Sequence, residues 1–300
     1  MKQLPLTILL LTLAAQPAAS QLILEGTQEI DFERPESWAM QYYAAATMPS
    51  ALGTSRRFDA GQLELGVEYG QIPSLTEAER QVGFNGTKLE DLNRTSFLLR
   101  PVATVGLGKG LALSASYVPP IESDGVEPNI FTLSLGRPVL ERSRWRLGLR
   151  IAAQTGSVKG DLTCSGKQVA GGDDPGSNPF GCEETSNDKN EFTTVGLEVS
   201  SAWTLGSDGV WEPHLALALH HLDLEFQVNA QYSGITDRSR LTTDGEIWTA
   251  SAGITYRPTS QWGLTAEAFY APLEIVRPPS TSRQTEELLS FRAHLSYRLR

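Results

Sequence analysis

The sequence predicts an all-β protein, an antiparallel up-and-down transmembrane β-barrel of about ten strands with a short N-terminal helical or irregular segment. From residue 61 onward, apolar and polar residues alternate in short runs bounded by Gly, Pro, Ser or Asp, which is the pattern of strands joined by turns. The connections between these runs alternate between long and short. Transmembrane barrels have short periplasmic turns and long outer loops, whereas a soluble sandwich has no reason to sort its loops by length.

Residues 1–20 have the layout of a cleaved secretory signal peptide. Lys2 supplies a positive charge, Leu4 to Ala15 form a short apolar stretch, and Ala18-Ala19-Ser20 offers small residues for cleavage. The apolar stretch is shorter than the roughly 20 residues that a membrane-spanning helix needs. We therefore expect an exported protein.

Residues 21–60 are expected to form an N-terminal plug or periplasmic segment. The stretch from Arg34 to Met48 begins with a proline and an acidic residue and continues into alanines, which favours a helix. Its apolar residues also alternate, so an additional strand is an open alternative. An additional strand would make the strand count odd, whereas even-stranded barrels keep both termini periplasmic. We expect a helix that plugs or braces the barrel.

Residues 61–300 are expected to form the barrel. Its strands are predicted at residues 61–70, 97–107, 111–117, 131–135, 145–151, 195–203, 211–219, 248–256, 262–268 and 289–299. In the last run the odd positions from Leu289 to Leu299 are apolar and the even positions are polar. Because successive side chains of a strand point to opposite faces, the apolar parity is expected to face lipid and the polar parity the lumen.

The seventh run changes its apolar parity near its end. Leu215 and Leu219 are odd, whereas Leu222 and Leu224 are even. A β-bulge at His220-His221 would explain the change. A strand that leaves the membrane and continues as an extracellular hairpin with its own packing would explain it equally well.

Aromatic residues gather beside the short turns and the chain end. They are Trp145, Trp203, Trp211, Tyr256, Trp262 and Tyr297. Indole and phenol rings prefer the lipid headgroup interface, where the ring is apolar and its polar tip stays wet. The placement therefore indicates an aromatic girdle on one rim of the barrel.

With these features, residues 61–300 resemble the Gram-negative outer-membrane β-barrel proteins, although no subfamily is matched. The resemblance implies an outer-membrane location, contact with lipid and insertion by the barrel assembly machinery. Proteins of this class commonly end in an aromatic residue that the machinery reads. This chain ends in Tyr297-Arg298-Leu299-Arg300, with its aromatic residue three positions early.

Composition excludes several functions. Without Lys2, the chain has 24 lysines and arginines against 35 acidic residues, a net charge of −11, which argues against a nucleic-acid partner. Cys164 and Cys182 share one polar segment, and in an oxidising compartment we expect them to form a disulfide. They lack two further ligands for zinc, and Asp173-Asp174 lacks calcium-ligand spacing, so no metal or cofactor is expected.

The polar parity predicts a charged lumen wall in which acidic and basic groups are nearly matched. It contains Glu64, Glu68, Arg100, Arg146, Arg150, Glu198, Glu212, His214, Glu267, Arg292 and His294. Arg292 and His294 of the last strand are expected to meet Glu64 or Glu68 of the first. The wall is either a salt-bridge network that stiffens the barrel or a charged, gated passage for a small solute. Ten strands leave a narrow interior, because an open aqueous porin needs roughly 16–18.

Three function classes therefore stay open. The leading one is a narrow channel or transporter for a small or apolar solute, or a structural envelope protein. The second is a hydrolase with a rim site at His221 and Asp223, since a carboxylate can orient an imidazole for general-base work. Its His-x-Asp order is the reverse of the Asp-x-His order in the omptin proteases. The third is a surface-binding barrel that contacts a partner through its long loops.

Overall fold

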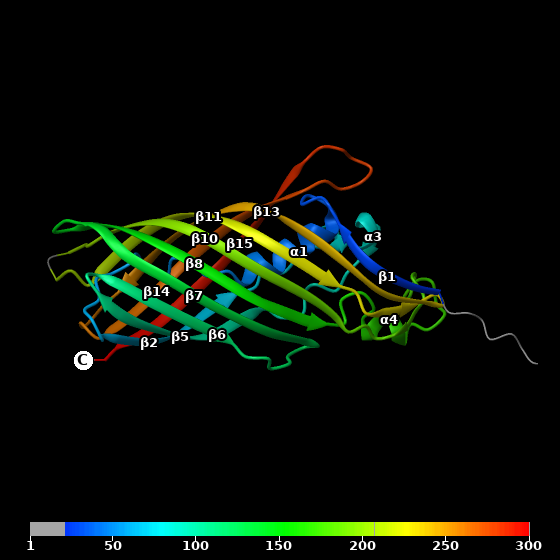
Figure 1. Ribbon diagram of the computed structural model, residues 1–300, viewed down its shortest axis with the longest axis horizontal. Coiled ribbons are helices and arrows are strands. Elements are labelled where there is room, and N and C mark those ends of the chain that lie inside the picture. Colours follow the sequence, from blue (N-terminus) through cyan, green and yellow to red (C-terminus); the bar gives the residue numbers. More distant parts are fainter. Residues whose placement is uncertain (1–21, 207, 300) are drawn as a thin grey trace, which may run out of the picture.

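The computed structural model describes residues 22–206 and 208–299, so the predicted signal peptide lies outside the described residues. Ten strands form a closed barrel in which each strand pairs antiparallel with the next one along the chain (Figure 1). They are β2 (Leu63–Gln71), β5 (Phe97–Gly108), β6 (Leu111–Val118), β7 (Val126–Glu141), β8 (Trp145–Gly160), β10 (Asp188–Trp203), β11 (Trp211–Gln227), β13 (Ile235–Tyr256), β14 (Trp262–Ile275) and β15 (Gln284–Arg298). The predicted fold class and strand number are confirmed.

Closure occurs where the last strand meets the first. β15 pairs antiparallel with β2, and the register places His294 opposite Glu68 and Arg298 opposite Glu64. Arg292 lies opposite Gly70, so the expectation that it meets Glu64 or Glu68 directly across the seam is wrong. Its acceptors are backbone carbonyls of the helix inside the barrel.

Smaller elements lie mostly at the end that carries the long loops. They are β1 (Leu22–Glu29), α2 (Glu77–Arg80), β3 (Gln81–Val82), α3 (Gly83–Gly86), β4 (Lys88–Leu89), α4 (Gly166–Ala170), β9 (Cys182–Glu184) and β12 (Ala230–Tyr232). β1 pairs parallel with β13, beside the start of that strand. In Figure 1, β1 and α4 lie at one end of the barrel and the C-terminus lies at the other. We call these ends the long-loop end and the short-turn end.

The outer surface of the barrel carries an apolar belt. On β11, for example, Leu215, Leu217 and Leu219 are 54, 63 and 54% exposed, whereas the intervening Ala216 is buried. The predicted outward parity is therefore present. Trp211 packs on Tyr256 and Trp262 on Tyr297 at the short-turn rim, with ring centroids 4.4 and 4.8 Å apart. An apolar band bordered by an aromatic rim, on a wall whose last strand pairs with its first, is the surface that a barrel in a lipid bilayer requires.

No helix among the described residues is long and apolar enough to cross a membrane. Helix α1 (Pro35–Thr47) instead lies inside the barrel, where ten of its residues, including Trp38, Tyr42 and Ala45, are buried (Figure 1). The proline at its first turn and the acidic Glu36 explain where the helix begins. The expected helix is confirmed over this segment, and the alternative of an additional strand there is wrong.

One side of the barrel is taller than expected, because several strands continue beyond the apolar belt. β13 begins at Ile235 rather than near residue 248, and β10 begins at Asp188 rather than 195. β11 pairs with β10 and β13 in one unbroken register, so the bulge considered at His220-His221 is absent from this described strand. Leu222 and Leu224 point into the barrel, where they are fully buried in the apolar core around α1.

Candidate functional site

The interior of the barrel is divided into two halves by the C-terminal end of α1. Wall arginines bind its last carbonyl groups: Arg100 Nη1 donates to the carbonyl oxygen of Thr47 at 3.0 Å, and Arg292 donates to those of Met48 and Ala45. Carbonyl groups at a helix C-terminus lack intrahelical partners, and the helix dipole favours cations there. The barrel wall therefore fixes the helix within the lumen.

A layer of buried ion pairs surrounds this end of α1. Arg100 Nη2 and Nε lie 2.7 and 2.8 Å from the two carboxylate oxygens of Glu68, and both side chains are buried. On the opposite wall His214 Nε2 lies 2.9 Å from Glu267, and Arg150 pairs with Glu198. Buried charges are tolerated only when they are paired and hydrogen-bonded. This layer of paired charges lies between the two halves of the lumen.

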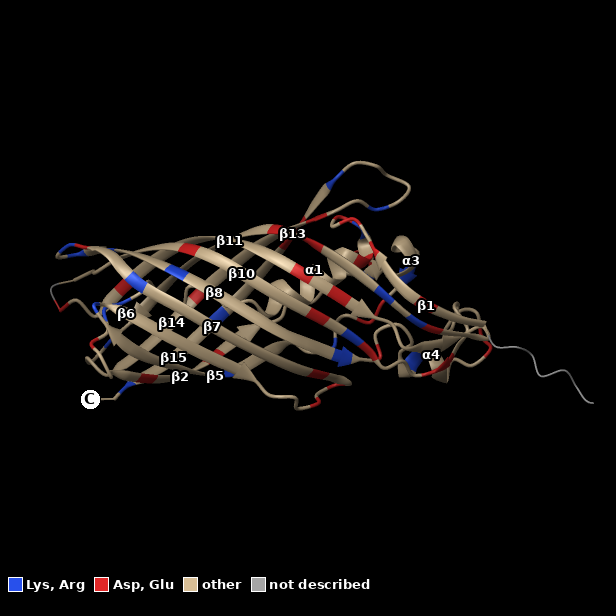
Figure 2. Cartoon of the chain, viewed as in Figure 1, with Lys and Arg blue, Asp and Glu red and all other residues tan. Residues whose placement is uncertain are grey.

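A second group of ion pairs lies nearer the short-turn end, where Figure 2 shows charged positions on the turns and lower strands. Glu64 accepts from Arg56 at 3.5 Å and from Arg298 at 3.2 Å. Glu212 accepts from Arg146 at 3.2 Å and Arg257 at 2.9 Å. Arg56, Arg257 and Arg298 are not among the lumen charges predicted from the sequence. Arg298 could have been assigned to the lumen, because it lies on the polar parity of the last strand. Arg56 and Arg257 lie in connections, where no alternation indicates which way a side chain points.

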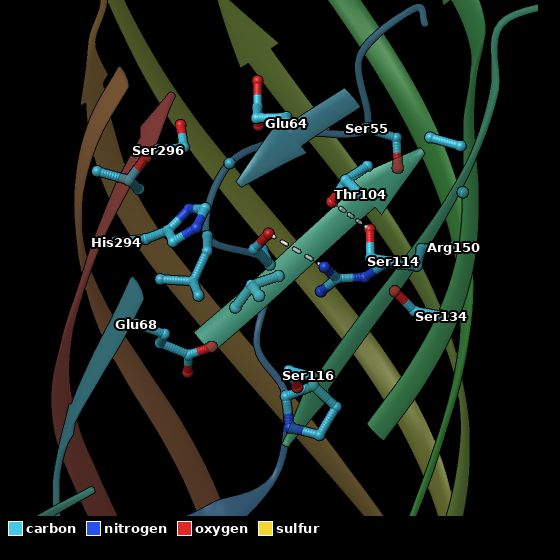
Figure 3. Close-up of a pocket in the computed structure, with 18 of the residues that line it drawn as sticks. Ser55, Glu64, Glu68, Thr104, Ser114, Ser116, Ser134, Arg150, His294 and Ser296 are labelled. Carbon is cyan, nitrogen blue, oxygen red and sulfur yellow. Dashed lines mark hydrogen bonds between the residues drawn. The ribbon is translucent and has the colours of Figure 1, made fainter. Parts of the chain in front are cut away.

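His294 differs from its neighbours. It lies opposite Glu68 in register, yet its Nε2 has no hydrogen-bond partner within the described chain. Its ring borders a small polar cavity of about 140 Å³ between the wall and residues 49–58. Figure 3 shows serine, threonine and charged side chains around this cavity, including Ser116, Ser134 and Arg150. This half of the lumen is polar and nearly filled.

The opposite half, toward the long-loop end, is apolar and contains a cavity of about 310 Å³ that we call the outer chamber. Its walls come from α1, β10, β11, β13 and the connection between β2 and β5. Its apolar lining includes Ala39, Met40, Tyr43, Val82, Leu92, Leu162, Phe226, Val228 and Leu241. Ligand pockets in proteins have this size and this predominance of apolar side chains.

A neighbouring cavity of about 300 Å³, the side chamber, shares Tyr43 and Leu92 with the outer chamber. Its lining combines inward-facing residues such as Leu98 and Val118 with Phe97 and Leu99, which are both 50% exposed on the barrel exterior. The side chamber therefore extends through the wall to the outer surface.

Strand pairing explains this opening. The ladder between β5 and β6 ends at the Val102–Ser116 pair. Above it β5 pairs only with β2, as far as Gln71–Phe97, and β6 pairs only with β7. Pro101 occupies the next position of β5, and a proline has no amide hydrogen to donate to a ladder. The two strands thus separate at the level of the side chamber.

The connection between β8 and β10 covers the outer chamber. The expected disulfide is present, with Cys164 and Cys182 joined at 2.01 Å. Lys88, which is almost fully buried, donates to the carbonyl oxygen of Thr163 beside this disulfide and pairs with Glu90. Burial raises the pKa of the Glu90 carboxyl to about 7, although the Lys88 ammonium acts in the opposite direction.

His221 and Asp223 lie elsewhere. Both are exposed on the outer face of β11 and belong to neither chamber. In register, His221 faces Glu246 and Asp223 faces Asp244 on β13. Asp174 accepts hydrogen bonds from Gly176 and Ser177 within a solvated turn. No group of three or more metal-binding side chains occurs among the described residues.

The closed antiparallel wall, its apolar belt and its aromatic rim are those of a membrane-spanning β-barrel. No protein-family model matches the sequence, and no curated protein matches it.

Solved structures with a similar fold include an outer-membrane channel from Pseudomonas putida F1, at 11% identity and TM-score 0.43, covering 82% of this chain and 98% of that one. The outer-membrane protease OmpT of Escherichia coli has 9% identity and TM-score 0.39, covering 80% and 94%. The attachment protein Ail of Yersinia pestis has 10% identity and TM-score 0.32, covering 80% and 99%. Identities and scores this low carry no conclusion about function.

Proposed function

We propose that this protein is a narrow outer-membrane transporter for small, largely apolar molecules. The observation that carries the proposal is a pair of neighbouring apolar chambers that share Tyr43 and Leu92 as lining, the second of which reaches the exposed Phe97 and Leu99 where β5 and β6 separate. A solute would enter the outer chamber from the long-loop end, pass into the side chamber and leave sideways between β5 and β6 into the lipid.

The polar half of the lumen supports this route over a straight passage. An apolar solute moving on toward the short-turn end would have to displace α1 and the Arg100–Glu68 and His214–Glu267 pairs. Separating a buried ion pair leaves uncompensated charges, which costs several kcal/mol. The sideways exit breaks no such pair.

Uptake of the apolar dye N-phenylnaphthylamine by intact bacterial cells tests the proposal. Cells that carry the wild-type protein in their outer membrane should take up the dye several-fold faster than cells with an empty vector. The purified protein should show no steady ionic conductance in planar bilayers. Dye uptake equal to that of the vector, or a stable porin-sized conductance, would contradict the proposal.

The exit is tested by Pro101→Thr, which supplies the missing amide and lets β6 pair further along β5. This variant should lower dye uptake toward the vector level while the barrel still folds. Pro138→Thr is the matched control, because Pro138 also lies in the wall at a register shift but far from both chambers. Equal uptake by the two variants would contradict the sideways route.

A further inference from the structure

Asn190 is a polar side chain in the apolar half of the barrel that has no protein partner in the described chain. Asn190 points inward from β10, where the register places it between Val158 of β8 and Phe226 of β11. It is fully buried, and neither its amide nitrogen nor its amide oxygen reaches a hydrogen-bonding group of the described chain. Asn190 lines the outer chamber.

Such an arrangement is unfavourable for folding. Burying an amide without partners removes its hydrogen bonds to water and replaces them with nothing, and native proteins contain few such groups. A leucine would fit the neighbouring valine and phenylalanine better. The amide at this position therefore needs a reason outside the folding of the chain.

The other ionisable groups around the chamber are already engaged. Asp237 accepts from the Tyr232 hydroxyl at 2.7 Å and from the Ser239 amide at 2.9 Å. Glu36 pairs with Arg34 at 3.1 Å, and Glu90 pairs with Lys88. The hydroxyl of Tyr43 resembles the amide of Asn190, since it is buried and has no partner in the described chain. These two side chains are the groups that a bound molecule would satisfy.

We propose that the outer chamber selects neutral amphiphiles, molecules with an apolar body and one hydroxyl or amide group that Asn190 and Tyr43 bind. This inference rests on the proposed function, since it assigns the substrate class of the same chamber. An asparagine amide donates and accepts, and a tyrosine hydroxyl does both. A hydroxyl or amide on the solute matches that pattern.

Charge on the solute is disfavoured by the same lining. Glu36, Glu90 and Asp237 surround the chamber, so an anionic head would meet like charges. The basic lining residue, Arg34, is already paired with Glu36. A cationic head would have to displace existing contacts, because Asp237 already accepts hydrogen bonds from Tyr232 and Ser239 and Glu90 is already paired with Lys88. The polar group of the solute is therefore neutral.

The test compares 1-octanol with octane, which have the same chain but differ in the hydroxyl. Binding to the full-length barrel in lipid nanodiscs is measured by headspace partition against empty nanodiscs. The wild-type protein should bind 1-octanol about tenfold more tightly than octane, the gain expected from one to two satisfied hydrogen bonds. Asn190→Leu should lose most of that preference while octane binding is kept, and Tyr43→Phe should lose part of it.

Thr194→Val is the matched control, because Thr194 is a buried polar residue on the same face of β10 but outside the chamber lining. It should keep the preference. Unfolding by guanidinium separates binding from a structural role: Asn190→Leu should be at least as stable as wild type.

Two further outcomes overturn the inference. Equal wild-type binding of both probes, or an Asn190→Leu variant that still prefers 1-octanol, would overturn it and leave the proposed function standing if the dye is taken up. Binding of neither probe, together with no dye uptake, would overturn both.

Discussion

Glu90 and Lys88 form an ion pair within the loops over the outer chamber. They lie outside the membrane-spanning strands, and their pair links the β2–β5 connection to the disulfide-bonded connection through Thr163. Burial raises the pKa of Glu90 to about 7, from an ordinary value of 4.5. Between these two pH values the folded protein binds more protons at Glu90 than the unfolded chain does.

The free energy of unfolding should therefore fall as pH rises from about 4.5 to 7, by at most about 3 kcal/mol from this residue. The measurement is guanidinium unfolding of the wild type and of Glu90→Gln, which stays neutral throughout. The stability of the glutamine variant relative to wild type should increase over this interval and then level off. A constant difference across the interval would contradict the assignment.

Arginine–glutamate pairs contribute differently to the stability of the protein, depending on whether they are buried or exposed. The Arg100–Glu68 pair is buried and fixes α1, whereas the Arg57–Glu141 pair at the short-turn end is largely exposed. Exposed pairs contribute roughly 0–1 kcal/mol, and a buried pair that loses one member leaves a costly charge. Removing one member of a buried pair should therefore destabilise the protein more than removing one member of an exposed pair.

At the scale of elements, α1 depends on the wall for its position. Its C-terminal carbonyl groups accept hydrogen bonds from Arg292, whose guanidinium also stacks 3.7 Å from the Phe269 ring centroid. A helix of 13 residues is marginal by itself in water. Its stability inside the barrel comes from this anchoring and from the burial of Trp38, Tyr42 and the alanines.

Arg292→Met keeps the aliphatic packing but removes the charge and the hydrogen bonds. We expect a loss of roughly 2–3 kcal/mol in unfolding free energy and faster amide hydrogen exchange over residues 35–48. Arg142→Met, at an exposed turn, should change neither. Unchanged exchange in α1 of the Arg292 variant would show that the helix does not depend on this anchor.

At the scale of the whole molecule, the apolar belt fixes where the bilayer lies. Leu217 is 63% exposed in the middle of the belt, and His221 is exposed on the same face of β11 beyond it. Leu217→Arg should cost about 2–4 kcal/mol in a barrel refolded into lipid vesicles, and His221→Arg about 0–1 kcal/mol. Guanidinium unfolding in vesicles measures both, and similar costs would mean that the bilayer lies elsewhere on the barrel.

Much of the barrel could be predicted from local pattern. Ten runs of alternation located the ten strands, because a wall between lipid and lumen imposes a period of two on every residue. The outward leucines of β11 and the rim aromatics followed from the same period. The sequence shows that the apolar parity changes at Leu222 and Leu224, but it does not show why. The reason is that α1 fills the barrel at that height, so inward positions there are apolar.

The chambers could not be predicted in this way. Tyr43, Leu92 and Asn190 come from a helix, a connection and a strand, and no spacing in the chain relates them. The separation of β5 and β6 near Pro101 could not be predicted for the same reason. A proline in a strand indicates a break in the sheet only once the neighbouring strand on its amide side, here β6, is known.

The sequence by itself determined the barrel, its lipid-facing surface and the disulfide, because each depends on residues near one another in the chain or on a period repeated along it. Only the tertiary structure decided which half of the lumen is lined by paired charges and which is apolar. That division depends on how far α1 enters the barrel and on which wall arginines meet its last carbonyl groups, and both are contacts between residues far apart in the chain.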